Sequence, residues 1–367
     1  AAGLSLGHQS WSKTGQTKWN NPFTGEWYLY QLPDTPMKAR LLANENPYGP
    51  SEKAKQALVD ALPIGNRYSW DIANELRKII ADNEGLTPEH VILSAGSLEV
   101  LNLVAIHYGL QKGNLISAFP TFEPLMLTAA GLDCDWEQVL LDQNHRHDLA
   151  AMEAKISADT RLVYVCNPNN PTGTLLDPTA LKDFCRKAAR KVPLFVDEAY
   201  TEFLEKPEDH TIIPLIKEGH NLIVAKTFSK IHGFAGLRIG YALAQPETWK
   251  EMKKYRPYET TMAGPTLKAA IASYQDQEFQ HNCRDKNTAA KNYTLETLRA
   301  MGYEPVPSYT SFMIFPIKMK PDQFIKDMRA QGVGIRSWSF ADKDWCRVSI
   351  GTMEEMKIFT EALKTIS

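Results

Sequence analysis

The sequence predicts an α/β fold, with a large domain built on a mostly parallel sheet covered by helices and a smaller α+β domain after it. Two patterns predict this: short apolar runs alternate with helix-like stretches up to Pro257, and the pattern then changes. A chain of 367 residues is also longer than most single cores. We therefore expect an N-terminal arm over 1–45, a large domain over 46–260 and a small domain over 261–367.

The first 40 residues carry several aromatic side chains among Gly, Asn, Ser and Pro, with no helical or alternating period. Disordered tails are usually poor in aromatic residues. We therefore expect an arm that packs on the body or on a partner subunit. Its aromatic residues are Trp11, Trp19, Trp27, Tyr28 and Tyr30.

The next part of the chain alternates between helix and strand patterns. Ser51 is a good cap for a helix that runs to Leu62, and residues 72–82 have helical spacing of apolar residues. Short apolar runs are typical of strands buried on both faces, and helices between such strands indicate a parallel sheet. The predicted strands are 91–93, 115–118, 162–165, 194–196 and 222–224, with helices that include 148–156 and 178–190.

The smaller domain begins near residues 258–264. One long helical segment is predicted over about 265–300, and strands are predicted over 312–315, 333–335 and 346–350. Helices followed by separate strands are typical of an α+β unit.

Composition narrows the class of function. The net charge is −2 with both signs interspersed, so we expect neither a nucleic-acid partner nor an acidic membrane partner. Five scattered cysteines without a Cys-x-x-Cys pair argue against a disulfide framework and a zinc site. No run approaches the roughly 18 apolar residues of a membrane span, so we expect a soluble, cytoplasmic protein. The first residues, Ala1-Ala2-Gly3, also fit a cleaved signal peptide, which leaves export as an alternative.

Three candidate functional residues follow predicted strands. Asn170 follows the run that ends at residue 165, Asp197 follows the run 194–196 directly, and Lys230 follows the run 222–225. Ligands of open α/β sheets bind at the carboxyl ends of strands. Each residue alone could be a helix cap or a turn, but three in succession favour a site. A lysine with an arginine eight residues later, Arg238, suits a Schiff-base cofactor that has a phosphate tail.

Several motifs occur in an order that resembles a known family. They are Asn44 to Gly49, Arg67-Tyr68, Pro120 to Phe122, Asn169 to Gly173, Asp197 to Tyr200, Ser229-Lys230, Gly236 to Gly240 and Arg347 to Thr352. With these motifs the chain resembles the pyridoxal-phosphate enzymes of fold type I, which share the aspartate aminotransferase fold. It is most similar to the histidinol-phosphate aminotransferase family.

The resemblance implies roles for the residues around the cofactor ring. Lys230 would form a Schiff base with pyridoxal 5′-phosphate and, once released, would move the substrate's proton. Asp197 would pair with the pyridine nitrogen and keep it protonated. Asn170 and Tyr200 would hydrogen-bond the 3′ oxygen, and Phe122 would stack on the ring.

The cofactor phosphate needs hydrogen-bond donors and a cation. A predicted helix opens at Ser97, so free backbone amides could face the phosphate there. Relatives usually have an acidic residue where Leu98 stands. The resemblance also implies a homodimer with shared active sites. The expected phosphate ligands are Gly96, Ser97, Thr227, Ser229, Arg238 and, from the neighbouring subunit, Tyr68.

The substrate site is expected to hold an anion. Arg347 matches an arginine that binds a substrate carboxylate or phosphate, and a planar guanidinium suits either anion. Arg336 resembles a second anion-binding arginine of the histidinol-phosphate family. Tyr48 is expected to close over the pocket, and Asn170 to contact the substrate as well.

These features predict a transaminase of amino-acid biosynthesis that needs no metal. It would move an amino group from histidinol phosphate or an aromatic amino acid to a 2-oxo acid such as 2-oxoglutarate. A decarboxylase or a carbon-sulfur lyase of the same fold would keep Lys230, Asp197 and Arg238, because these enzymes differ in substrate orientation. A cofactor-binding module without turnover is a further alternative, although such a module has no need of a proton-moving lysine.

Overall fold

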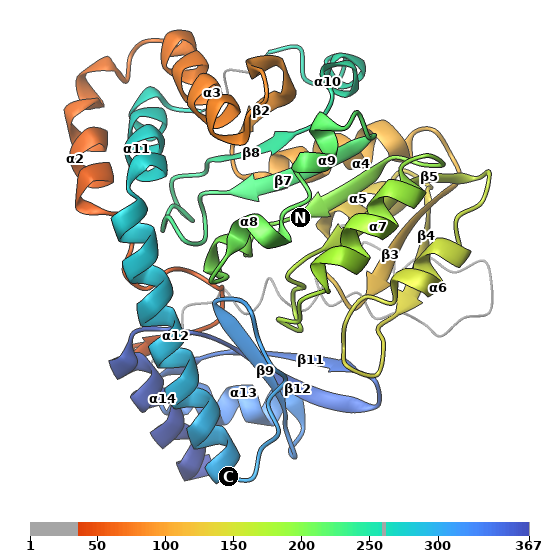
Figure 1. Ribbon diagram of the computed structural model, residues 1–367. Helices are drawn as coiled ribbons and strands as arrows, with labels where there is room; N and C mark the ends of the chain where they lie inside the picture. Colours follow the sequence, from red (N-terminus) through yellow and green to blue (C-terminus); the bar gives the residue numbers. More distant parts are fainter. Residues whose placement is uncertain (1–35, 259–261, 367) are drawn as a thin grey trace, which may run out of the picture.

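A seven-stranded sheet forms the centre of the larger part of the molecule (Figure 1). The computed structural model describes residues 36–258 and 262–366, so residues 1–35 of the predicted arm, with the five aromatic residues named above, lie outside the described residues. The strands, in spatial order, are β2 (Val91–Ser94), β8 (Gly240–Leu243), β7 (Leu222–Thr227), β6 (Leu194–Asp197), β5 (Thr160–Cys166), β3 (Asn114–Phe119) and β4 (Asp135–Leu140).

The sheet is parallel apart from the pairings of β8. That strand runs antiparallel to β2 on one side and to β7 on the other, whereas the pairs from β7 across to β4 are parallel. This arrangement confirms the predicted α/β class. The sequence did not predict β4 and β8. Most residues of β4 are at least partly exposed at the sheet edge, so this strand gives no long apolar run. Strand β8 follows β7 without an intervening helix, so the alternation of helices and strands does not reveal it.

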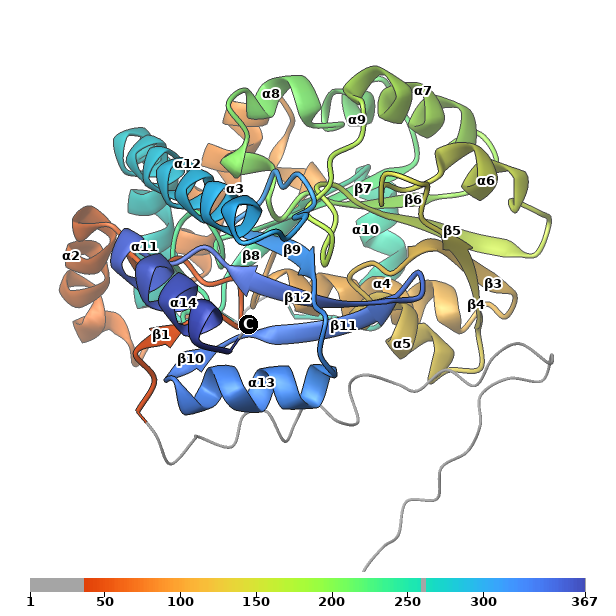
Figure 2. The ribbon, with the colours of Figure 1, turned by 90° about the horizontal axis from the view of Figure 1, so that it is seen from below.

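Helices cover both faces of the sheet, as Figure 2 shows. Consecutive residues of a strand point to opposite faces. In β5, Val163 and Val165 lie in one apolar core, whereas Leu162 and Tyr164 lie in the other. Both faces are therefore buried, which is why these strands appear in the sequence as continuous apolar runs. One face carries α6 (Leu149–Ala154), α7 (Pro178–Ala188) and α9 (Pro214–Lys217); the other carries α4 (Ser97–Gly109), α5 (Pro124–Ala130) and α10 (Pro246–Met252).

The two helices predicted before the sheet are present. Ser51 caps α2 (Glu52–Asp60) by accepting a hydrogen bond from the Ala54 amide at 3.2 Å. The helix ends two residues before the predicted limit, and a short 3₁₀ turn (Leu62–Ile64) follows. The second helix is α3 (Trp70–Glu84), and both pack against α11 (Gly264–Gln275).

The C-terminal part contains α12 (Gln277–Ala300), which reaches from the large sheet to the small one in Figure 1. The prediction of one helix over 265–300 is wrong, because the helix is interrupted at Asp276, between α11 and α12. The carboxylate of that residue accepts a hydrogen bond from Lys53 at 2.9 Å. The small sheet has the order β11 (Arg336–Phe340), β12 (Lys343–Ser349) and β9 (Phe312–Pro316), flanked by α13 (Pro321–Ala330) and α14 (Met353–Ile366).

The first described residues belong structurally with this C-terminal part. Strand β1 (Ala39–Arg40) pairs in parallel with β10 (Val333–Gly334), and Leu41 lies in the same apolar core. The domain limits at residues 45 and 260 stay predictions. None of the helices in 36–258 and 262–366 combines the length and apolar character that crossing a bilayer requires.

Candidate active site

Lys230 lies in the loop that follows β7, at the carboxyl edge of the large sheet. Its Nζ donates a hydrogen bond to the Asn44 carbonyl at 3.1 Å and lies 5.4 Å from the centre of the Tyr200 ring. Burial, followed by the positive charge of Arg347, lowers the pKa of the amine to about 8. The neutral, nucleophilic form of the amine is therefore far more populated near neutral pH than it is in an ordinary lysine.

Two other lysines, Lys226 and Lys291, show that burial alone does not distinguish the Lys230 amine. Burial alone would lower the pKa of Lys226, but Glu202 and Glu198 raise it, and the ammonium is paired with them at 2.9 and 3.3 Å. Burial lowers the pKa of Lys291 to about 8 as well. The Lys291 amine, however, donates to the carbonyls of residues 308 and 310 in a loop of the C-terminal part. Lys230 differs from both because Asp197 and Tyr200 lie near its amine.

Asp197 ends β6 and is 2% exposed. Its carboxylate accepts hydrogen bonds from the Ala199 amide at 3.1 Å and from the Tyr164 hydroxyl at 3.3 Å. Burial raises the pKa of the carboxyl to about 6, although these two hydrogen bonds act in the opposite direction. A cationic ring nitrogen beside Asp197 would stabilise the carboxylate, so the environment suits the predicted partner.

Asn170 and Tyr200 each accept a hydrogen bond from a residue far away in the sequence, which is Arg347 for Asn170 and Asn44 for Tyr200. The Asn170 Oδ1 atom accepts a hydrogen bond from Arg347 Nη1 at 2.6 Å, which leaves the amide nitrogen of Asn170 as its donor group. The Tyr200 oxygen accepts one from Asn44 Nδ2 at 3.0 Å. Burial raises the pKa of the Tyr200 phenol, so the hydroxyl keeps its proton.

The residues predicted to bind the phosphate come together at the start of α4. Arg238 donates to Ser229 Oγ at 3.4 Å and to the Ala95 carbonyl at 3.3 Å. Gly96 has φ +82°, and a Cβ atom there would lie 2.2 Å from Arg238 Nη2, so a side chain would displace the guanidinium. Ser97 begins the helix, and the amides of a first helical turn have no acceptor within the helix.

Thr227 and Leu98 flank this corner. The Thr227 hydroxyl accepts a hydrogen bond from the Ser229 amide at 3.1 Å. Leu98 is 42% exposed in the first turn of α4, where the backbone amides keep their positions whatever the side chain. The cradle of glycine, helix amides, hydroxyl and guanidinium therefore fits a phosphate group.

Arg336 and Arg347 face each other across β11 and β12, as directly opposed residues of an antiparallel pair. Their side chains therefore lie on the same face of the small sheet. The positive charges of both arginines lower the pKa of Lys230, which indicates that both lie near its amine. Arg347 is buried, and its guanidinium carbon lies 4.3 Å from the centre of the Trp338 ring.

The remaining predicted residues lie in three different settings. Tyr48 packs beside the apolar cluster that contains Tyr200, with the Lys286 amine 4.7 Å from its ring centre. Phe122 packs, half-buried, against one core of the large sheet. Tyr68 is 75% exposed in the single chain and stacks on Trp70 with 5.3 Å between ring centres.

Asn44 begins the motif Asn44 to Gly49, but it was not predicted to be an active-site residue. It is buried, has φ +53°, and contacts Lys230, Tyr200 and Ser349, which are 156 to 305 positions away in the chain. Asn is one of the few residues other than glycine that tolerate this backbone region, and this is a signal that sequence could have offered.

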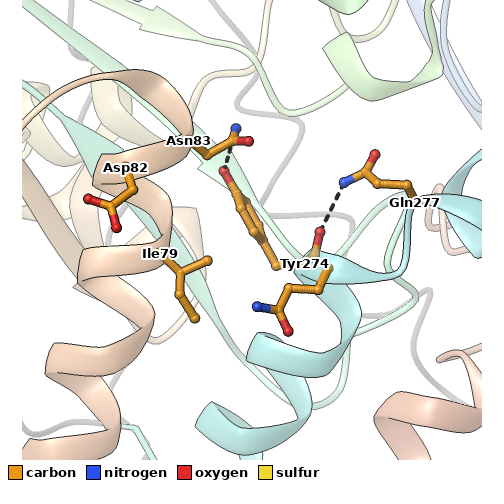
Figure 3. Close-up of a pocket in the computed structure, with 6 residues that line it drawn as sticks. Ile79, Asp82, Asn83, Tyr274 and Gln277 are labelled. Atoms are coloured by element: carbon orange, nitrogen blue, oxygen red, sulfur yellow. Dashed lines mark hydrogen bonds between the residues drawn. The ribbon is translucent and has the colours of Figure 1, made fainter.

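Two hollows lie outside this constellation. One, of about 310 Å³, adjoins the lysine loop and is lined by residues that include Glu45, Gly236 and Ser349. The other, of about 410 Å³, lies between α3 and the start of α12 (Figure 3). Its lining also includes the end of α11, where Tyr274 accepts a hydrogen bond from Asn83 at 3.1 Å, but none of the predicted site residues.

Comparisons with known proteins show the family of the chain. Residues 36–363 match the family model described as aminotransferase class I and II. The histidinol-phosphate aminotransferase of Brevibacillus brevis is 35% identical over 329 residues, covering 89% of this chain and 90% of that protein. The enzyme of the same name from Moorella thermoacetica is 33% identical over 336 residues, covering 89% and 85%.

A solved structure gives the same fold. The histidinol-phosphate aminotransferase of Sinorhizobium meliloti, in complex with pyridoxal-5′-phosphate, superposes with a TM-score of 0.81 at 23% identity, covering 95% of this chain and 96% of that one. The fold and the relatives define a pyridoxal-phosphate-dependent transaminase of fold type I. The chain belongs to the family of class I and II aminotransferases, and within it is close to the histidinol-phosphate aminotransferases.

Proposed function

We propose that this transaminase takes its amino group from a donor that carries a separate anionic group, with histidinol phosphate as the leading candidate. The acceptor would be a 2-oxo acid such as 2-oxoglutarate, and the cofactor would be attached covalently to Lys230. The observation that carries the donor proposal is the cross-strand pair of Arg336 and Arg347.

Like charges directly opposite each other destabilise a strand pair, so an anion bound between two such arginines would stabilise this arrangement. Arg347 is partly compensated by carbonyl oxygens, since its Nη2 atom donates to the Leu42 carbonyl at 3.2 Å and its Nη1 atom to Asn170. A phosphate or carboxylate bound between the guanidinium groups would be recognised by their planar, bidentate geometry.

The chain's own groups fit the steps of transamination. Bound pyridoxal phosphate supplies a reactive aldehyde and an electron-accepting ring. The Lys230 amine would take the proton from the substrate's Cα atom and deliver it to the cofactor's C4′ atom. The Asp197 carboxylate would stabilise a cationic ring nitrogen, and the Tyr200 hydroxyl would donate a hydrogen bond to the ring's 3′ oxygen. Arg238, Ser229 and the first amides of α4 would hold the phosphate tail.

An aromatic amino acid is a second candidate donor. The Trp338 ring lies against Arg347, and the Phe340 ring stacks on Trp345 with 5.0 Å between centres, so aromatic surface borders the arginine pair. A carboxylate held by Arg347 would use one of the two facing guanidinium groups, whereas a phosphate has oxygen acceptors for both. For this reason we place histidinol phosphate first.

A panel of amino donors tests the proposal. Histidinol phosphate, phenylalanine, tyrosine and glutamate are each mixed with the cofactor-loaded protein, and the oxo product is measured. We expect histidinol phosphate to react, and Arg336→Gln to raise its KM about 10- to 100-fold, because a charged hydrogen bond contributes about 1.5–3 kcal/mol. Arg186→Gln, which removes an exposed ion pair with Glu218, is the matched control. Reaction of phenylalanine or tyrosine without histidinol phosphate would overturn the donor assignment.

A second copy of the chain is proposed to complete the active site. Large apolar or aromatic side chains are exposed between residues 59 and 70, and such patches on soluble proteins commonly mark interfaces. Tyr68 lies among them, as expected of a residue that contacts the cofactor phosphate of a partner subunit. The exposed group consists of Val59, Leu62, Ile64, Tyr68 and Trp70.

Leu62→Asp tests the dimer. A charge within the patch should convert the dimer to a monomer in analytical ultracentrifugation, and the monomer should lose its cofactor during gel filtration. The control is Leu110→Asp, because Leu110 is a similarly exposed leucine outside the patch. Monomers of Leu62→Asp that keep the cofactor as firmly as the parent protein would contradict shared active sites.

A further inference from the structure

Asn44 connects Ser349 of the small sheet with Tyr200 and Lys230 beside the large sheet through four hydrogen bonds. Its amide N–H donates to Ser349 Oγ at 2.7 Å, and the Ser349 hydroxyl donates to Asn44 Oδ1 at 3.0 Å. Its Nδ2 atom donates to the Tyr200 oxygen at 3.0 Å, and its carbonyl accepts from Lys230 Nζ at 3.1 Å. All these groups are buried apart from the half-buried lysine.

The Ser349 contacts determine which way the Asn44 amide points. The serine hydroxyl has one hydrogen, and this hydrogen is directed at Oδ1. The Nδ2 group therefore faces Tyr200. An amide nitrogen donates and does not accept, so the Tyr200 oxygen acts as an acceptor in this contact. The hydrogen of the Tyr200 hydroxyl must then point elsewhere.

We propose that Asn44 is a positioning residue that directs the Tyr200 hydrogen toward the 3′ oxygen of the cofactor and holds the Lys230 amine through its carbonyl. This inference rests on the proposed roles of Tyr200 and Lys230. It assigns Asn44 a function that its place in the NENPYG segment does not reveal.

The contacts between Asn44 and Ser349 also connect the active site with β12, the strand that carries Arg347. Arg347 and Ser349 are two residues apart in β12 and therefore lie on the same face. The Ser349 amide also donates to the Leu41 carbonyl at 2.9 Å, and Arg347 donates to the Leu42 carbonyl. The segment that ends at Asn44 is thus held by the strand that carries the predicted anion-binding arginine.

Asn44→Asp tests the proposal, because aspartate has nearly the same shape but offers an acceptor in place of the Nδ2 donor. Tyr200 would then donate to residue 44 and no longer to the cofactor. The visible absorbance of the loaded protein is followed against pH. We expect its transition to move up by about 1 pH unit, since the donated hydrogen bond favours the deprotonated form.

The new negative charge would itself raise the transition, so the substitution is repeated in a Tyr200→Phe background. The proposal predicts that more than half of the shift disappears there, as expected for coupled residues. The charged groups whose fields act on Lys230, which are Asp197, Glu45, Arg336 and Arg347, stay the same in both backgrounds. A shift of equal size in both, or no shift at all, would overturn the assignment.

Ser349→Ala gives a second test without any change of charge. It removes the hydroxyl that orients Asn44, so the transition should move in the same direction by a smaller amount, and again less in Tyr200→Phe. An unchanged transition counts against the proposal. Thermal unfolding of the cofactor-free variants controls for folding. If the parent protein itself shows no visible band with the cofactor, the proposed function fails first, which separates the two outcomes.

Discussion

Lys230→Ala is expected to lower the transamination rate by at least about 10⁴-fold, because the variant loses both the covalent anchor and the group that moves the proton. The cofactor should still bind without a covalent link, since Arg238, Ser229 and the α4 amides are unchanged. Single-turnover kinetics with saturating donor measure the loss, and a small primary amine added to the solution should restore part of the rate.

Lys291→Ala is the matched control for this experiment. Its amine has a pKa lowered to about 8, as does that of Lys230, but it lies in α12 beside a loop of the C-terminal part. The control should keep nearly the full rate. If the two variants lost activity equally, a depressed amine pKa and not the position beside Asp197 and Tyr200 would be the relevant property, and the account would fail.

Asp197→Asn is expected to lower the rate about 100- to 4,000-fold, because leaving a buried charge without its partner costs about 3–5 kcal/mol and each 1.4 kcal/mol is tenfold. Cofactor retention should change much less, since the predicted phosphate contacts are made by other residues. The measurement is kcat together with the cofactor content after gel filtration.

Glu198→Gln separates this effect from general destabilisation. Glu198 is adjacent in sequence and equally buried, but its carboxylate accepts from the Ile212 amide and pairs with Lys226. We expect this variant to unfold at a lower temperature and to keep its kcat. A loss of kcat as large as that of Asp197→Asn would contradict the special role of Asp197.

The sequence predicted the centre of the fold because most of its strands are buried on both faces. The side chains of β5 point alternately into two apolar cores, so the strand appears in the sequence as one apolar run. Most side chains of the edge strand β4 are at least partly exposed to water, so its sequence has no such run. The break at Asp276 between α11 and α12 could not be predicted, because no glycine or proline marks it and the Lys53 partner is 223 residues away.

The same distinction applies to the site. Asp197 and Lys230 follow strands, so the rule for open α/β sheets places them at one edge without knowledge of the coordinates. The facing of Arg336 and Arg347 depends on the register of a hairpin, and the contacts of Asn44 depend on a left-handed backbone and partners up to 305 residues away. These relations become visible when the chain is folded.

The central claim is that pyridoxal phosphate is attached covalently to residue 230. The direct test is to load the protein, reduce it with borohydride and locate the added mass by peptide mass spectrometry. We predict one pyridoxyl-phosphate adduct on the peptide that contains Lys230. An adduct on Lys226 or Lys291 instead, or a colourless protein without any adduct, would contradict the claim.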